Sequence, residues 1–157
     1  MDGMARITVA EVERAVAAAL RRAGCDGEKA VAVAGVVAAA ERDGCASHGV
    51  FRLGGYLAAL RSGKVDGAAR PAVSLLAPSV LRIDARGGIF LLAIDPARFG
   101  DAGGWLGHAE GFLARPSALE GVRLPGDRRA ANRRRSDAEG VEIPAKLWAE
   151  VLAAAGG

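Results

Sequence analysis

The stretch TVAEVERAVAAALRRAG, residues 8–24, has the pattern of a complete amphipathic helix. Thr8 and Glu11 have the spacing of a capping box, in which each side chain accepts a hydrogen bond from the other residue's backbone amide. The apolar residues that follow recur on one face at helical spacing. Gly24 can adopt the left-handed conformation that ends a helix. We therefore predict a helix over residues 9–23 with one face in the core.

Two further helices are predicted in the N-terminal region, residues 1–70. Asp26 is a suitable N-cap for a helix that ends near Gly44. The centre of that helix is apolar around most of its circumference, which is typical of a central, buried helix. A third helix is predicted from Ser47 to Gly63, with a stripe of leucines on its core side.

The middle region, residues 71–99, has the pattern of short strands. The apolar segments 72–76 and 80–84 are predicted to form two strands or one broken strand. The run from Ile89 to Ile94 is apolar on both faces, as in a strand at the centre of a sheet. Because such a strand needs neighbours on both edges and the chain offers few, we expect the isolated chain to be marginally folded or to self-associate through this run.

The C-terminal region, residues 100–157, returns to helical patterns. Helices are predicted over residues 104–113 and 127–138. A last helix is predicted after Ile143, with Pro144 in its first turn. Helices at both ends with short strands between them predict an α+β fold that is largely helical and contains a small sheet.

Composition and charge restrict the classes of partner. The 157 residues suit one globular domain, and 51% hydrophobic with 25% charged residues exclude a disordered chain. The net charge of +3 is mild, and the arginines within residues 123–135 have no aromatic residues among them. A solvated helix face therefore fits them better than a nucleic-acid surface. No apolar run approaches the roughly 20 residues that span a membrane, and no signal peptide is recognised. We expect a cytoplasmic protein without membrane contact.

No metal site is predicted. Cys25 and Cys45 lack the spacing of a metal or redox motif and are interpreted as small buried side chains. His108 and Glu110 are two residues apart, so they do not share a helix face and cannot bind one metal ion together.

The chemistry-bearing residues are Ser47, His48, Arg52 and Tyr56. In a helix that begins at Ser47, the other three lie four residues apart along one face. Arginine can bind a carboxylate with two hydrogen bonds, and histidine can exchange a proton near neutral pH. A 2-oxo acid or a cyclic 2-imino acid fits this stripe, with its carboxylate on Arg52 and its oxygen or nitrogen facing His48. A capping serine beside a surface histidine–arginine pair is the alternative interpretation.

The segment from Glu41 to Pro71, which includes the motif Ser-His-Gly-Val-Phe-Arg at residues 47–52, resembles the malate/L-lactate dehydrogenase family of NAD(P)-dependent oxidoreductases. Within that family it most resembles the Δ1-piperideine-2-carboxylate reductase branch. Residues 90–101, 122–127 and 140–148 resemble the late strand and closing helices of the same family.

The resemblance implies reduction of a 2-oxo acid or a cyclic 2-imino acid by hydride from NADPH or NADH. It makes His48 the catalytic proton donor, with Ser47 as its companion. It makes Arg52 the anchor for the substrate carboxylate. Tyr56 matches a family position among the substrate-binding residues, without a defined role.

The chain also departs from the family pattern. Members are much longer and carry a large central segment between the turn at residues 84–87 and the strand that begins near residue 88. That segment supplies most of the sheet, the cofactor site and an acidic partner for the histidine. The resemblance therefore implies a chain with its middle excised near residues 87–89, inactive alone and unable to hold NADPH or NADH by itself. In addition, Gly54 stands where the family usually has proline.

A second class of function remains open. The chain can be a non-catalytic helical module that keeps the family's dimer contacts and associates with itself or with a full-length relative. It can also be a relic without a role.

Overall fold

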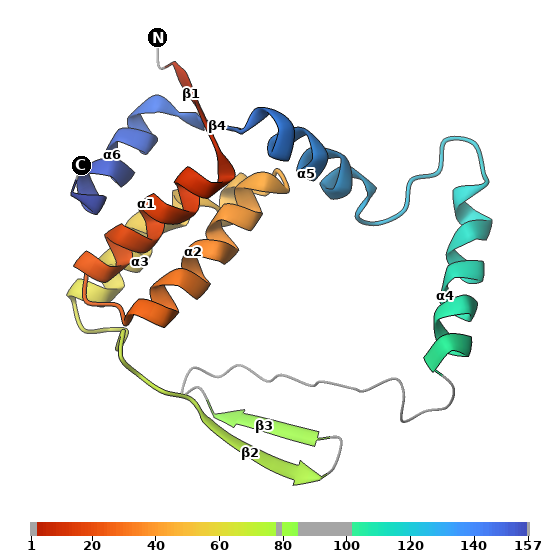
Figure 1. Ribbon diagram of the computed structural model, residues 1–157, viewed down its shortest axis with the longest axis horizontal. Coiled ribbons are helices and arrows are strands. Elements are labelled where there is room, and N and C mark those ends of the chain that lie inside the picture. Colours follow the sequence, from red (N-terminus) through yellow and green to blue (C-terminus); the bar gives the residue numbers. More distant parts are fainter. Residues whose placement is uncertain (1–2, 78–79, 85–101, 157) are drawn as a thin grey trace. The chain divides into compact units, whose positions relative to one another are not determined.

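A computed structural model describes residues 3–77, 80–84 and 102–156. It divides the chain into two compact units (Figure 1). The first unit contains Met1–Ala68 and Gly126–Gly157, and the second contains Ala69–Pro125. The α+β class predicted from the sequence is confirmed, because helices dominate and the described strands form two small sheets.

The first unit is mainly helical. In chain order its elements are β1 (Met4–Ile7), α1 (Val9–Arg22), α2 (Gly27–Arg42), the 3-10 turns η1 (Ala46–His48) and η2 (Val50–Arg52), α3 (Leu53–Arg61), α5 (Asp127–Glu139), β4 (Val141–Pro144) and α6 (Ala145–Ala155).

The ends of α1 are set by the residues that the sequence indicated. Glu11 donates its backbone amide to Thr8 Oγ1 at 3.2 Å, and Thr8 donates its amide to the Glu11 carboxylate at 2.9 Å. This reciprocal pair confirms the capping box. Gly24 follows the helix with a φ of +94°, in the left-handed region that glycine adopts without strain. The cap of α2 by the Asp26 carboxylate is also confirmed.

An antiparallel pair of strands joins the two segments of the first unit. β1 pairs with β4 in the register Met4 to Pro144 and Ile7 to Val141. The pairing was not predicted from the sequence, because each strand has only four residues and its partner lies at the other end of the chain. Gly140 approaches Ile7 so closely that an added Cβ would lie 2.7 Å from the Ile7 carbonyl oxygen. A side chain at residue 140 would therefore disrupt the sheet.

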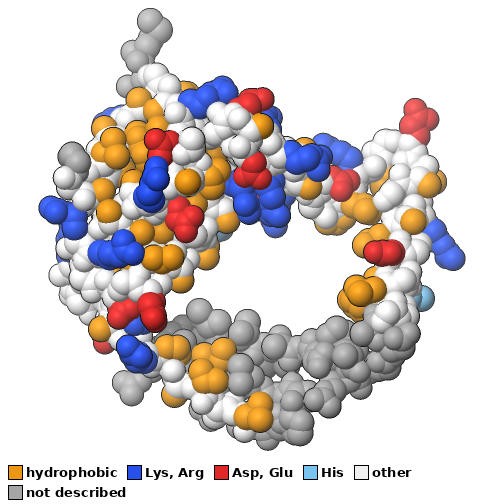
Figure 2. Space-filling model, viewed as in Figure 1, with side chains coloured by type: hydrophobic (Ala, Val, Ile, Leu, Met, Phe, Trp, Pro, Cys, Tyr) orange, Lys and Arg blue, Asp and Glu red, His pale blue; other side chains and the backbone are white. Residues whose placement is uncertain are grey.

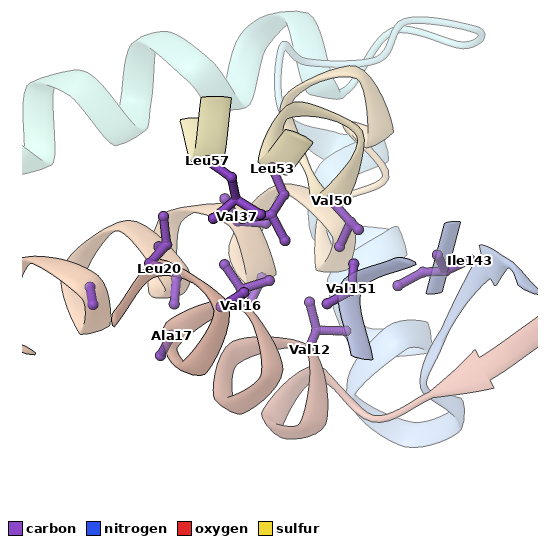
Figure 3. Packing of buried hydrophobic residues seen from close by; sticks show 14 of the residues in the cluster. Val12, Val16, Ala17, Leu20, Val37, Val50, Leu53, Leu57, Ile143 and Val151 are labelled. Carbon is purple, nitrogen blue, oxygen red and sulfur yellow. The ribbon is translucent and has the colours of Figure 1, made fainter. Parts of the chain in front are cut away.

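One apolar core fills the first unit (Figure 3). Side chains from α1, α2, the loop before α3, α3, β4 and α6 point toward one another in it. Its largest fully buried members are Leu20, Ile143, Val12, Val16, Val37 and Val50. Ala30 and Ala34 of α2 are also fully buried, and their small side chains permit close packing of helices.

The prediction that α2 is buried on most sides is wrong for the first unit. Three of its alanines and Val37 pack in the core, whereas Val31, Val33 and Val36 are exposed, the last to 69%. The physical reason is that neighbouring elements pack on the alanine-rich side of α2 and leave the side that carries these three valines open.

The predicted third helix is divided in the structure. Two 3-10 turns, η1 and η2, precede α3, and Gly49 lies between them. The helical spacing from Ser47 to Gly63 therefore holds only within α3. Its leucine stripe is confirmed, since Leu53 and Leu57 are buried in the core.

The predicted helices of the C-terminal region are present with adjusted ends. α5 begins at Asp127 as predicted, and its arginines are exposed, as Figure 2 shows for the face in view. In α6 the first helical residue is Ala145, and Pro144 is the N-cap rather than a residue of the first turn. Among the described helices, none is long and apolar enough to cross a membrane.

The second unit contains a hairpin and a helix. β2 (Ala72–Ala77) and β3 (Val80–Asp84) pair antiparallel, which confirms two strands here. α4 (Ala102–Ser117) is longer than predicted and has Pro116 in its last turn. Its large apolar side chains are exposed: Trp105, Leu106, Phe112 and Leu113. The run from Ile89 to Ile94 and the junction near residues 87–89 lie outside the described residues.

The pairing of β1 with β4 should contribute strongly to stability through Ile143, which is 1% exposed. We expect Ile143→Ala to lower the free energy of unfolding by about 2–5 kcal/mol, because it leaves a cavity in the core. Glu142→Ala, on the same strand, removes only the exposed ion pair with Arg6 and should cost less than about 1 kcal/mol. Urea unfolding measures both values. Equal losses would show that the strand does not anchor the core.

Candidate functional site

The loop between α2 and α3 brings Ser47, His48 and Arg52 together. Ser47 Oγ lies 3.0 Å from His48 Nδ1, within hydrogen-bond distance. Arg52 Nε donates to the Ser47 carbonyl oxygen at 2.9 Å. All three residues are exposed. When the Ser47 hydroxyl donates to Nδ1, the neutral imidazole carries its own proton on Nε2. The loop thus presents a proton-carrying ring and a guanidinium from one short turn.

Ser47 does not cap a helix. The N-cap position of η1 is Cys45, and no side chain accepts a capping hydrogen bond there. The prediction that a helix begins at Ser47 is therefore wrong, because the chain forms a 3-10 turn there and α3 starts only at Leu53. As a result, the Ser47 hydroxyl is placed beside His48 rather than over a helix end.

Glu41, in the last turn of α2, holds this loop from below. Its Oε1 accepts a hydrogen bond from the Val50 backbone amide at 2.7 Å. The residue is only 9% exposed, and burial raises the pKa of its carboxyl, with the Val50 hydrogen bond opposing that shift. Glu41 was not predicted as a functional residue, and it is only the first residue of the segment that resembles the family. A glutamate near the end of a helix rich in alanine and valine, close before a glycine turn, is the signal that could have identified it.

α5 holds the other end of the loop. The Arg133 guanidinium donates to both carboxylate oxygens of Asp43, at 2.9 and 2.7 Å. This hydrogen-bonded pair keeps the pKa of Asp43 below its usual value. Asn132 Nδ2 donates to the Asp43 carbonyl oxygen at 3.1 Å. Gly44 is in the left-handed region with a φ of +75°, and an added Cβ would lie 2.2 Å from Asn132 Nδ2. The start of the loop is therefore fitted closely against α5.

Ser47 lines a cavity of about 330 Å³ in the first unit. Its other lining residues include the two carboxylates Glu41 and Glu142 and an apolar wall of Phe51, Ile143, Pro144 and Leu147. The cavity has the volume of a small-molecule site, but its two carboxylates oppose an acid, and neither His48 nor Arg52 is among its lining residues.

Tyr56 is placed apart from this cavity. It lines an apolar groove of about 480 Å³ beside α2 and α3, with Cys25, Val36 and Leu60 among its neighbours. Of the four residues singled out from the sequence, the structure joins Ser47, His48 and Arg52 by hydrogen bonds, whereas Tyr56 borders a different surface feature.

Metal ligands do not gather in the part of the chain that the structure describes, where no group of three or more histidine, cysteine, aspartate or glutamate side chains could bind an ion. Cys25 and Cys45 are free thiols and are partly buried.

The geometry of the loop can be compared with known proteins. Residues 7–89 match the model of the malate/L-lactate dehydrogenase family, and this match includes the whole Ser47–Arg52 loop. The chain belongs to the malate/L-lactate dehydrogenase family. The family membership suggested by the motif is thereby confirmed.

Several relatives within this family are reductases of cyclic imino acids. The chain is 43% identical over 95 residues to a Δ1-pyrroline-2-carboxylate reductase of Ancylobacter novellus, covering 60% of this chain and 28% of that protein. It is 43% identical over 93 residues to a Δ1-pyrroline-2-carboxylate/Δ1-piperideine-2-carboxylate reductase of Pseudomonas putida, covering 59% and 27%. It is also 46% identical over 88 residues to a (2R)-3-sulfolactate dehydrogenase (NADP(+)) of Chromohalobacter salexigens, covering 56% and 26%.

A solved member of the family has a similar structure. The crystal structure of Δ1-piperideine-2-carboxylate reductase from Pseudomonas syringae matches with a TM-score of 0.51 and 31% identity, over 71% of this chain and 30% of that one. Residues 1–89 alone could not supply that share of the chain, so the structural match extends beyond residue 89. The chain spans less than a third of the length of each of these relatives.

The Asp43–Arg133 pair should hold α5 against the loop. We expect Arg133→Ala to increase amide hydrogen exchange in α5 and at Gly44, and to lower the Tm. Arg134→Ala, also in α5 and exposed, is the matched control and should leave both unchanged. Because the pKa of Asp43 is lowered in the folded chain, its stabilising contribution is present above its ordinary pKa and is lost as pH falls through the lowered value. The two variants should therefore converge in stability at low pH. A constant difference would contradict this role.

Glu41 should give the opposite pH dependence. Because its pKa is raised, the folded chain holds this proton more tightly than the unfolded chain does. That contribution is fully present below the ordinary glutamate pKa of about 4.3 and is lost as pH rises through the raised value. Glutamine does not titrate, so the stability of Glu41→Gln relative to the unmodified chain should increase across this window. Urea unfolding at a series of pH values tests this, and parallel curves would exclude it.

Proposed function

We propose that this chain supplies the proton-donating and carboxylate-binding loop of a family reductase that acts on a small 2-oxo acid or cyclic 2-imino acid. The observation that carries the proposal is the hydrogen-bonded arrangement of Ser47, His48 and Arg52 on one exposed turn. Reduction of such an acid adds a hydride at C2 and a proton on the attached oxygen or nitrogen. The product is a 2-hydroxy acid or a cyclic amino acid.

Each residue has a role that its chemistry supports. His48 gives its proton to the substrate oxygen or nitrogen. Ser47 orients the imidazole through the hydrogen bond at Nδ1. Arg52 binds the substrate carboxylate through its guanidinium, while its Nε remains bonded to the Ser47 carbonyl. Tyr56 is a candidate substrate-binding residue only if the bound substrate also borders the apolar groove that Tyr56 lines.

Two cavities of the described first unit do not fit a nicotinamide dinucleotide, which carries a doubly anionic pyrophosphate. A polar cavity of about 450 Å³ contains Arg6 and Arg135 but also three glutamates. Arg6 already pairs with two of them, Glu139 and Glu142, at 3.5 and 2.8 Å. The groove beside Tyr56 is mainly apolar. These surroundings favour neither phosphate nor ribose, so we assign NADPH or NADH to a family segment that this chain lacks or to another chain.

An excised central segment explains why this chain contains the Ser47–Arg52 motif while these two described cavities do not suit the cofactor. The family match ends at residue 89, next to the proposed junction, and the structural match continues past it. We therefore infer that the chain corresponds to both ends of a longer family member, is inactive alone, and is completed by a full-length relative. The open apolar sides of α2 and α4 favour association, and they equally support the alternative of a non-catalytic interaction module.

The first test is cofactor binding by the chain alone. We expect NADPH and NADH to bind no more tightly than millimolar, because the described cavities oppose an anionic dinucleotide. Titration followed by nicotinamide fluorescence measures this. A micromolar Kd would contradict the assignment of the cofactor site to another segment or chain.

The second test is complementation. The chain is mixed with a full-length family reductase whose own motif histidine has been replaced by alanine, and turnover of a cyclic imino acid is measured. The unmodified chain should restore turnover, and His48→Ala should lower it by at least about a hundredfold. Arg52→Lys should mainly raise KM, about tenfold, because lysine keeps the charge and loses the two-pronged contact. Arg134→Ala should have no effect. Failure of the unmodified chain to restore turnover would favour the non-catalytic module.

A further inference from the structure

Glu41 is in an unusual position for a charged side chain. It is 9% exposed in the last turn of α2, and the only hydrogen bond that the structure gives its carboxylate among the described residues is the one from the Val50 amide. Within the described residues, Glu41 forms no hydrogen bond or ion pair with His48 or Arg52. Burial of a carboxylate is unfavourable unless a specific contact offsets it. The contact with the loop is therefore the feature that distinguishes this residue.

Gly49 is fitted to the same carboxylate. An added Cβ at residue 49 would lie 2.0 Å from Glu41 Oε1 and 2.4 Å from its Cδ. Gly49 has a φ of −88°, so backbone strain does not require glycine here. The requirement is space, because the carboxylate occupies the position that a side chain would fill. Glu41 and Gly49 thus form a matched pair.

The point of contact lies in the middle of the motif. Ser47 and His48 precede Gly49 in η1, and Arg52 ends η2 just after Val50. The buried carboxylate of Glu41 therefore fixes the backbone at Val50, between His48 and Arg52. No other side chain in the described residues bonds to the backbone between them, since the Arg52 bond returns to Ser47.

We propose that Glu41 is a positioning residue that sets the relative orientation of His48 and Arg52 by holding the Val50 amide against Gly49. The proposal rests on the proposed function for its catalytic meaning, but its structural content concerns this chain alone. A glutamine at residue 41 keeps an acceptor oxygen at the same reach. An aspartate keeps the charge and withdraws it from the amide. The required property at residue 41 is thus a side chain long enough to bring an acceptor oxygen to the Val50 amide, rather than negative charge alone.

The test is NMR spectroscopy of the full chain without substrate or cofactor. Two signals are followed: hydrogen exchange of the Val50 amide, and the ring nitrogen chemical shifts of His48, which report its contact with Ser47. In Glu41→Ala and Glu41→Asp we expect Val50 exchange to increase about tenfold or more relative to amides in α1, since a hydrogen bond to a charged group is lost. The ring nitrogen chemical shifts of His48 at a fixed pH should change as its contact with Ser47 loosens. Glu41→Gln should retain both signals of the unmodified chain.

Two controls separate positioning from general stability. Val16→Ala weakens the same core without changing a residue of the loop, so it should change exchange throughout the first unit and leave the His48 ring chemical shifts unchanged. Gly49→Ala should reproduce the loop effects in the unmodified chain. It should have little further effect in Glu41→Ala, because the smaller side chain leaves room for the added methyl group.

Each result decides the proposal. It is overturned if Glu41→Ala and Glu41→Asp behave like Val16→Ala, or if Gly49→Ala acts independently of residue 41. If Glu41→Ala does not fold, Glu41→Asp and Gly49→Ala carry the same test. Because neither readout uses turnover, these outcomes are independent of the complementation test. If turnover is absent while the Glu41 variants change the Val50 and His48 signals as expected, the reductase function is rejected and the positioning role is retained.

Discussion

The pairing of β1 with β4 is the constraint on which the rest of the first unit depends. It places Val141 and Ile143 in the core beside residues of α1 and fixes where α5 ends and α6 begins. With α5 held there, Arg133 and Asn132 can reach Asp43 at the end of α2. The candidate site is therefore built on local turns whose geometry is determined by contacts between the two ends of the sequence.

The ends of several helices in the first unit could be predicted from the sequence, because they depend on local interactions. The capping box of α1, the Asp26 cap, the glycine after α1 and the leucine stripe of α3 all depend on residues a few positions apart. The motif at Ser47, His48 and Arg52 was identified for the same reason. Its detailed geometry was not, because helical spacing alone cannot show that the chain forms two 3-10 turns around Gly49.

The features that sequence reasoning missed are contacts between distant segments. Neither β1 nor β4 is long enough to have a recognisable pattern, and the docking of Arg133 on Asp43 joins residues 90 positions apart. The open side of α2 was missed for a related reason. Hydropathy indicates that its valines prefer an apolar environment, but it does not indicate which neighbouring element provides one.

The first unit is also discontinuous: the second unit, Ala69–Pro125, is inserted between its two segments. In polymer terms the strand pair closes a long loop. The entropic free-energy cost of closing a loop rises only with the logarithm of its length, by about 0.6 kcal/mol for each doubling. The intervening sequence can therefore lengthen or shorten greatly while the sheet and core that close it change little in energy. In a fold of this kind, a large insertion or deletion in the gene between the two segments of the first unit can leave that unit folded.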